Sequence, residues 1–150
     1  MKVRTALFVF FIFTLTSFGQ TQKENRNLES NIALQGYDPV SYFSVGKAQK
    51  GKKEFAVSIR NAIYYCYSAE NKKLLESNPN KYEPQYGGWC AYAMGANGEK
   101  VEIDPQTFKI INGKLYLFYN AYFSNTLKTW NKNETELKKK ADINWQKITK

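Results

Sequence analysis

Histidine is absent from the 150 residues of this chain. Without it there is no Ser-His-Asp triad, no Cys-His nucleophile pair, and no zinc or copper site with histidine ligands. The chain has two cysteines, Cys66 and Cys90, and they do not form the Cys-x-x-Cys pair of thioredoxin-like redox centres. The sequence marks no carboxylate pair either, because each acidic residue considered lies where a cap, a turn or a solvated face would place it. We therefore expect a protein that is not an enzyme.

Arginine is also scarce, since only Arg26 and Arg60 follow the first twenty residues. The formal net charge of +9 comes mostly from lysines in separate clusters. Nucleic-acid binding favours a stripe of arginine and lysine with interleaved aromatic residues. We therefore expect no nucleic-acid partner, and loose attraction to an anionic envelope surface is an alternative for the basic charge.

The chain also lacks a long hydrophobic run. Lys2 and Arg4 precede an apolar stretch at residues 6–15, which is shorter than the ~20 residues of a comfortable transmembrane helix. Small residues at 17 and 19 offer a peptidase site. We predict a signal peptide at residues 1–19, a flexible leader at residues 20–30 and one domain at residues 31–150. The protein is then periplasmic or secreted, without stable membrane insertion after cleavage; an uncleaved anchor is the alternative.

The pattern along residues 31–150 predicts an α+β fold. Asp38 and Pro39 begin a short helix at residues 39–44. Apolar alternation at residues 55–59 and β-favouring residues at 62–67 predict an antiparallel pair. Ser68 caps the next helix, in which Leu74 and Leu75 are expected to face inward.

The second half of the domain follows similar signals. The glycines at 87 and 88 precede a helix at residues 89–94 that is expected to stop at the glycine at 95. Asn112 and Gly113 predict a hairpin between residues 107–111 and 114–119. A helix is expected at residues 122–130, and Asn133 with Glu136 resembles a capping box for another. The fold class is thus a small single domain of two antiparallel β-hairpins packed with several short helices.

Three stretches of this sequence resemble one known family. They are Tyr-Tyr-Cys-Tyr-Ser-Ala-Glu-Asn at residues 64–71, Asn-Pro-Asn-Lys-Tyr at 78–82 and Gln-Tyr-Gly-Gly-Trp-Cys-Ala at 85–91. Together with residues 36–43 and 141–145, they resemble the YHS domain, and the chain is most similar to the exported stand-alone members. The resemblance implies a presumed metal-binding module.

The residues that carry this resemblance match only in part. Tyr65 and Ser68 are present, but the histidine is not. Metal-associated members have a cysteine directly before the serine, whereas Cys66 lies two residues before Ser68, and alternation along a strand turns that thiol to the opposite face. Cys90 matches the Gly-Gly-Trp-Cys-Ala motif of the exported members.

Sulfur ligands give the most specific binding hypothesis. Cys90 and Met94 stand four residues apart, on one face of the expected helix, and Cys66 is a third candidate. Thiolate and thioether ligands suit Cu(I). The protein is then an exported binding module for a soft transition metal such as copper. Alternatively, Met94 fills a gap in the core and the cysteines are small buried hydrophobes or form a disulfide.

Aromatic residues give the second hypothesis. Several tyrosines lie near predicted turns, where phenols could line a pocket with apolar walls and polar tips. The candidates for the lining are Tyr65, Tyr86 and Trp89. The protein is then a non-catalytic envelope interaction domain with structural cysteines, and its partner is an envelope protein, a peptide or a small molecule. The alternative is that these rings only fill the core.

Overall fold

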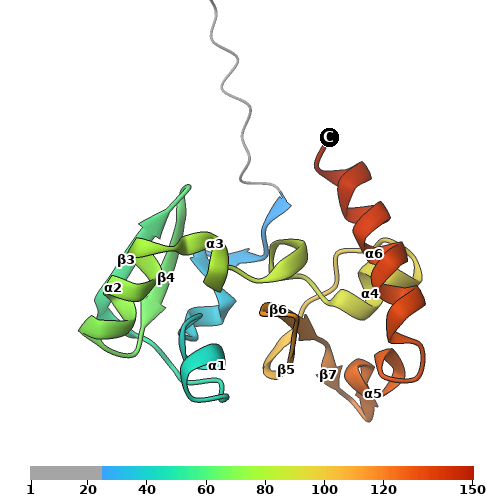
Figure 1. The fold of residues 1–150 in the computed structure, drawn as a ribbon, viewed down its shortest axis with the longest axis horizontal. Coiled ribbons are helices and arrows are strands. Elements are labelled where there is room, and N and C mark those ends of the chain that lie inside the picture. The colour runs from blue at the N-terminus through green and yellow to red at the C-terminus, as the bar shows by residue number, and fades with distance from the viewer. Residues whose placement is uncertain (1–24) are drawn as a thin grey trace, which may run out of the picture.

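The structure is a computed structural model that describes residues 25–150. The predicted signal peptide and the first part of the predicted leader lie outside the described residues. The fold is α+β, as predicted, and its two halves lie side by side in Figure 1: β3, β4, α1 and α2 on one side, and β5 to β7 with α4 to α6 on the other. No helix within residues 25–150 has the length and apolar character needed to cross a membrane.

A four-stranded sheet forms the first half. Its strands are β1 (Leu28–Glu29), β2 (Ile32–Ala33), β4 (Ala62–Cys66) and β3 (Lys52–Ile59), in that spatial order. β3 and β4 form the predicted hairpin, with Arg60 and Asn61 at its turn. β1 falls within the predicted flexible leader; it pairs with β2, and the Asn27 amide donates to the Gly87 carbonyl at 2.9 Å.

Short helices cover this sheet. They are η2 (Leu34–Gly36), α1 (Ser41–Ser44), α2 (Ala69–Ser77) and α3 (Pro79–Tyr82). The Ser68 hydroxyl accepts a hydrogen bond from the Asn71 amide at 3.1 Å, which confirms the predicted cap of α2. Leu75 is fully buried, but Leu74 is 38% exposed, so the expectation that both leucines face inward is wrong for Leu74.

The second half begins with η3 (Gln85–Gly88) and α4 (Ala91–Ala96). α4 ends at Ala96 and so runs past Gly95 instead of stopping there. A side chain at Gly95 would collide with the Leu137 backbone of α6 (Glu134–Ile148). Glycine therefore permits the close approach of two helices. The predicted hairpin follows as β5 (Asp104–Ile111) and β6 (Lys114–Phe118), joined by Asn112 and Gly113.

The prediction of one helix at residues 122–130 is wrong in its first part. The structure has a small hairpin, β7 (Asn120–Ala121) with β8 (Ser124–Asn125), before α5 (Thr126–Trp130). Tyr122 and Phe123 form its turn with φ angles of 49° and 66°, which a right-handed helix does not contain. The Asn125 side chain then caps α5 by accepting from the Leu127 amide at 3.1 Å.

Two buried clusters form the core. The first belongs to the sheet and its helices and extends to β6; it contains both cysteines. The second lies under α4, α5 and α6, and Trp130 is its largest fully buried side chain. η3 connects the two halves and contributes Tyr86 to the second cluster.

Candidate functional site

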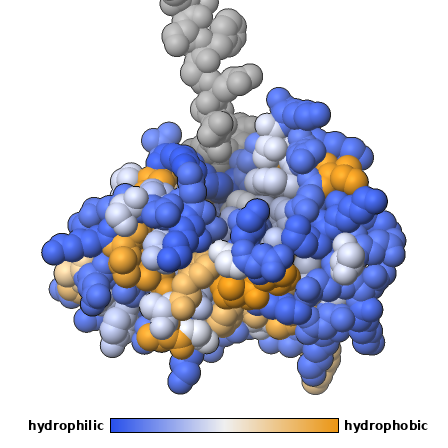
Figure 2. Space-filling view, in the orientation of Figure 1, coloured by the Kyte–Doolittle hydropathy of each residue, from blue (hydrophilic) through white to orange (hydrophobic). Residues whose placement is uncertain are grey.

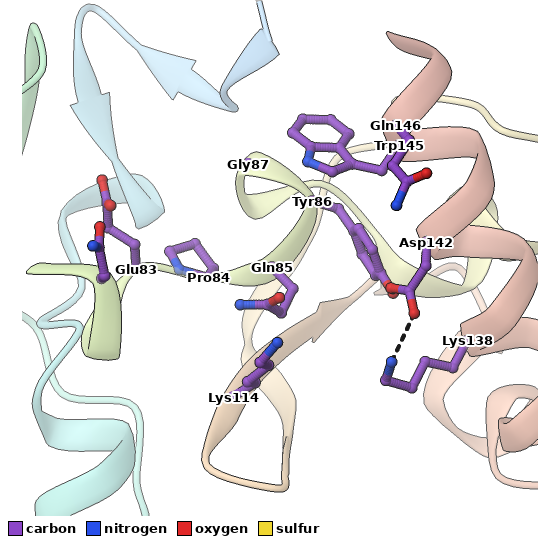
Figure 3. Close-up of a pocket in the computed structure, with 11 residues that line it drawn as sticks. Glu83, Pro84, Gln85, Tyr86, Gly87, Lys114, Lys138, Asp142, Trp145 and Gln146 are labelled. Atoms are coloured by element: carbon purple, nitrogen blue, oxygen red, sulfur yellow. Dashed lines mark hydrogen bonds and ion pairs between the residues drawn. The ribbon is translucent and has the colours of Figure 1, made fainter. Parts of the chain in front are cut away.

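A pocket of about 440 Å³ opens where η3, the start of β6 and α6 meet. Figure 3 shows Tyr86 and Gly87 on η3 facing Asp142, Trp145 and Gln146 of α6, with Lys114 below. The lining residues are Asn80, Glu83, Pro84, Gln85, Tyr86, Gly87, Lys114, Lys138, Asp142, Trp145 and Gln146. The pocket thus combines two aromatic rings with amide and charged side chains.

An unusual backbone turn presents Tyr86 to this site. Tyr86, Gly87 and Gly88 all have positive φ angles, of 55°, 62° and 88°. A Cβ at Gly87 would lie 2.5 Å from the Asn25 carbonyl oxygen and 2.9 Å from the Trp145 ring, so only glycine fits. The reversal brings the Tyr86 ring within 6.3 Å of the Trp145 ring, measured between centroids.

The Tyr86 phenol is a fixed, neutral donor. Its hydroxyl donates to Asp142 Oδ1 at 2.8 Å. Burial, and then the hydrogen bond to Asp142 and its charge, raise the pKa of Tyr86 well above its usual range. The other Asp142 oxygen accepts from Lys138 Nζ at 2.7 Å, and this hydrogen bond raises the pKa of Lys138. Both oxygens of Asp142 are therefore engaged.

Of the remaining charged side chains of the pocket, Glu83 forms ion pairs within residues 25–150 and Lys114 does not. Glu83 forms ion pairs with Arg60 at 2.7 Å and with Arg26 at 3.9 Å. Lys114 is exposed, and within residues 25–150 no carboxylate lies within ion-pair distance of it. An incoming ligand therefore meets a cation whose charge is not already matched, beside the half-buried faces of Trp145 and Pro84.

Cys90 holds two elements of the second half together. It is the N-cap residue of α4 and has no exposed surface. Its sulfur accepts a hydrogen bond from the Tyr119 amide at 3.4 Å and lies 3.4 Å from the Thr126 hydroxyl. The sequence placed Cys90 inside the first turn of a helix; the structure places it just before the helix, as a link to the β7–β8 hairpin.

Cys66 ends β4 and is also fully buried. Burial, followed by the negative charges of Asp38 and Glu76, raises the pKa of the Cys66 thiol to about 12. Both cysteines are free thiols, so the structure does not contain the alternative disulfide between Cys66 and Cys90. A thiol with so high a pKa stays protonated at neutral pH.

The proposed sulfur ligands belong to two buried clusters. Cys66 and Cys90 belong to the first buried cluster, whereas Met94 is fully buried in the second, among aromatic rings. Among the described residues, no three histidine, cysteine, aspartate or glutamate side chains are grouped so that they could hold a metal ion. Copper binding at Cys90 with Cys66 or Met94 therefore has no support from this grouping and stays a prediction.

The three aromatic candidates lie in different places. Tyr86 lines the pocket. Tyr65 lies on β4, where its ring would contact a side chain at Gly36, and the Trp89 indole donates to the Asn25 carbonyl at 2.9 Å; neither lines the pocket.

Sequence reasoning missed the α6 residues of the pocket. Lys138, Asp142 and Trp145 are spaced by four and three residues, and this spacing places them on one face of a helix. The spacing was therefore a readable signal for a shared site, although it does not say which segment faces it.

A buried carboxylate outside the pocket has a structural role. Asp38 accepts hydrogen bonds from the Val40 amide, the Ser41 hydroxyl, the Tyr67 amide and the Asn71 side chain, at 2.6 to 3.0 Å. The prediction of a helix from Pro39 capped by Asp38 is wrong in its start: α1 begins at Ser41, its N-cap is Val40, and Asp38 holds the turn directly before it. The other two bonds join this turn to the end of β4 and to α2.

Comparison with known proteins adds no assignment: no family model, no curated protein and no solved structure matches the chain. The similarity to the YHS domain stays a prediction from sequence motifs.

Proposed function

We propose that this protein is a non-catalytic binding module whose pocket at η3 and α6 takes a small molecule or peptide segment with a flat apolar part and a negative charge. The observation that carries the proposal is the pocket itself, which is lined by Trp145, Tyr86 and Lys114, with Lys114 below Gln85 in Figure 3. Ligand sites commonly combine apolar walls with a few placed polar groups.

The polar groups define the orientation of the ligand. Gln85 and Gln146 offer amide donors and acceptors at opposite sides of the pocket, and Lys114 supplies the cation (Figure 3). A peptide with an aromatic side chain and a free carboxylate satisfies these groups together. The ring packs on Trp145 while the carboxylate approaches Lys114.

The engaged carboxylates argue for binding rather than catalysis. Asp142 is held by Tyr86 and Lys138, and Glu83 is held by two arginines. A general base needs an accessible, unpaired oxygen near its substrate. We therefore propose that both carboxylates shape the pocket and transfer no proton.

Export through a signal peptide at residues 1–19 stays a prediction, and it would place the pocket in the periplasm or outside the cell. Copper binding by Cys90 with Cys66 or Met94 also stays a prediction. Titration of the reduced protein with Cu(I) against a competing chelator tests it, with Cys90→Ser in parallel. Because both thiols and Met94 have no exposed surface, we expect no tight binding that depends on Cys90.

The pocket is tested by NMR titration with N-acetyl-phenylalanyl-glycine as the probe. This peptide, which has a free carboxylate, is compared with the same peptide carrying a C-terminal amide. The amide has the same ring but no charge. We expect the acid to shift the Trp145 indole signal and to bind about threefold more tightly than the amide, as an exposed ion pair contributes little more. Lys114→Gln should abolish this difference.

Lys73→Gln, on the exposed face of α2 outside the pocket, is the matched control for charge and should leave both affinities unchanged. Trp145→Ala should weaken both probes. The proposal fails if the Trp145 signal does not respond to either probe, or if binding survives Trp145→Ala unchanged.

A further inference from the structure

The β7–β8 hairpin ends in two aromatic side chains that contact solvent. Tyr122 is 91% exposed and Phe123 is fully exposed, more than any other large hydrophobic residue among those described. An orange-tinted knob projects in Figure 2 from the lower edge, where Figure 1 places β7 and α5. Burial of large apolar side chains is favourable, so two neighbouring exposed rings on one tip indicate a binding surface.

The backbone conformation of the turn is energetically unfavourable for Tyr122 and Phe123. Both turn residues have positive φ angles, which asparagine and glycine tolerate and aromatic residues disfavour. The other two-residue hairpin turns of this chain with positive φ at both positions each contain asparagine: residues 30–31, 60–61 and 112–113. Among the two-residue hairpin turns of residues 25–150, this tip is the one with aromatic residues at both positions.

The base of the hairpin is anchored. Thr126 bonds the Tyr119 carbonyl with its amide at 3.0 Å and with its hydroxyl at 2.8 Å. Asn120 donates to the Thr107 hydroxyl at 3.0 Å, which ties β7 to β5. Cys90 contacts Tyr119 and Thr126 from below. The two rings are thus presented on a fixed stem.

Two exposed lysines follow the hairpin, and Asp104 contacts Asn120 at its base. Between Asp104 and Glu134 the chain contains four lysines and no acidic residue. Lys128 and Lys132 follow the hairpin on and just after α5, and both are exposed. The complete chain carries a net charge of +9. Lys128 and Lys132 are not in the ion pairs found among residues 25–150, so this surface favours a negatively charged partner.

We propose that the Tyr122–Phe123 tip inserts into the interfacial layer of an anionic lipid bilayer, with Lys128 and Lys132 near the headgroups. Aromatic rings favour the boundary between headgroups and acyl chains, and basic residues gain energy near anionic lipid. A narrow tip with two rings fits a deformable lipid layer. The docking is peripheral and uses neither the pocket nor the cysteines.

The test is cosedimentation with vesicles, using the chain from Gln20 onward, because the apolar stretch at residues 6–15 would itself bind lipid. Both buried clusters lie within this part of the chain. Vesicles of an equimolar mixture of phosphatidylglycerol and phosphatidylcholine are compared with vesicles of phosphatidylcholine alone. The double variant Tyr122→Asn, Phe123→Gly gives the tip the turn residues of the β5–β6 hairpin, so it should fold at least as well.

We expect the wild-type protein to bind the anionic vesicles and the double variant to bind about tenfold more weakly or less. Lys128→Gln with Lys132→Gln should weaken binding to anionic vesicles only. Ile143→Asn is the matched control, since Ile143 is an exposed apolar residue on α6, and it should bind like the wild type. Failure of the wild type to bind anionic vesicles at low salt, or equal binding by the double variant, overturns the proposal.

Discussion

Alkaline pH should unfold this protein, because buried tyrosines and Cys66 hold their protons more tightly when it is folded. The pKa values of Tyr42, Tyr64 and Tyr86 are raised above 10.0, chiefly by burial, and that of Cys66 is raised from 9.0 to about 12. A raised folded-state pKa gives stability that is complete below the unfolded pKa and is lost as pH rises. The loss therefore starts near pH 9 with Cys66 and steepens above pH 10.

Each tyrosine hydroxyl also donates to an acceptor that would repel a phenolate. The acceptors are the Pro105 carbonyl for Tyr42, Glu83 for Tyr64 and Asp142 for Tyr86. At pH 11 each unfolded tyrosine has gained about 1.4 kcal/mol from ionisation, and the unfolded cysteine about 2.7 kcal/mol. Together the folded state loses at most about 7 kcal/mol, which matches the whole stability of many domains, ~5–15 kcal/mol.

The measurement follows near-UV circular dichroism and tyrosinate absorbance along one pH titration. We expect the buried tyrosines to ionise together with loss of the folded signal, between about pH 10 and 11. Tyr64→Phe should reduce the loss of unfolding free energy between pH 8 and 11 by about 1.4 kcal/mol. Tyr122→Phe, at the exposed tip, should not change it. If all eleven tyrosines ionise near pH 10 while the folded signal persists, the reasoning is wrong.

Three further changes test other parts of the fold by urea denaturation. Gly87→Ala should lower the free energy of unfolding by about 2–4 kcal/mol, because the new Cβ collides with Asn25 and Trp145. Gly113→Ala, at a positive φ with open space around it, should lower it by only about 1 kcal/mol. Equal losses in the two variants would contradict the collision. Asp38→Ala should cost about 3–5 kcal/mol because four donors lose their acceptor, and a loss below about 1 kcal/mol would contradict it. The double variant Tyr122→Asn, Phe123→Gly should stabilise by about 1–2 kcal/mol by relieving turn strain, and a destabilised variant would contradict that strain.

Local signals account for the parts of the fold that the sequence predicts well. The turn at Asn112 and Gly113 and the cap at Ser68 each depend on residues within three positions, and each is found as expected. The β7–β8 hairpin was missed because its turn lacks such a signal. Phe123, Leu127 and Trp130 follow a helical period, whereas the hairpin is held by its own strand pairing and by contacts of Asn120 and Thr126.

The candidate site depends on contacts that sequence spacing does not report. Tyr86 reaches the pocket because Gly87 allows a reversed backbone that packs on Asn25 and Trp145, residues far away in the sequence. The spacing of Cys90 and Met94 indicated a shared helix face, but the Cys90 sulfur bonds to Tyr119 and Met94 packs in the other cluster. The spacing of residues predicts which face of one helix or strand they share. Whether side chains from several elements meet in one ligand site depends on how those elements pack.

The pocket and the hairpin tip use separate elements, and this separation makes the two proposals independent. The pocket is built on η3 and α6, whereas the tip stands on β7 and β8 and is tied to β5 and to Cys90. Substitutions at sites without shared partners act additively. Tip variants should therefore leave peptide binding unchanged, and Trp145→Ala should leave vesicle binding unchanged. Cys90→Ser differs from both: it weakens the anchor of the hairpin without touching the pocket, so it should reduce vesicle binding while peptide affinity persists.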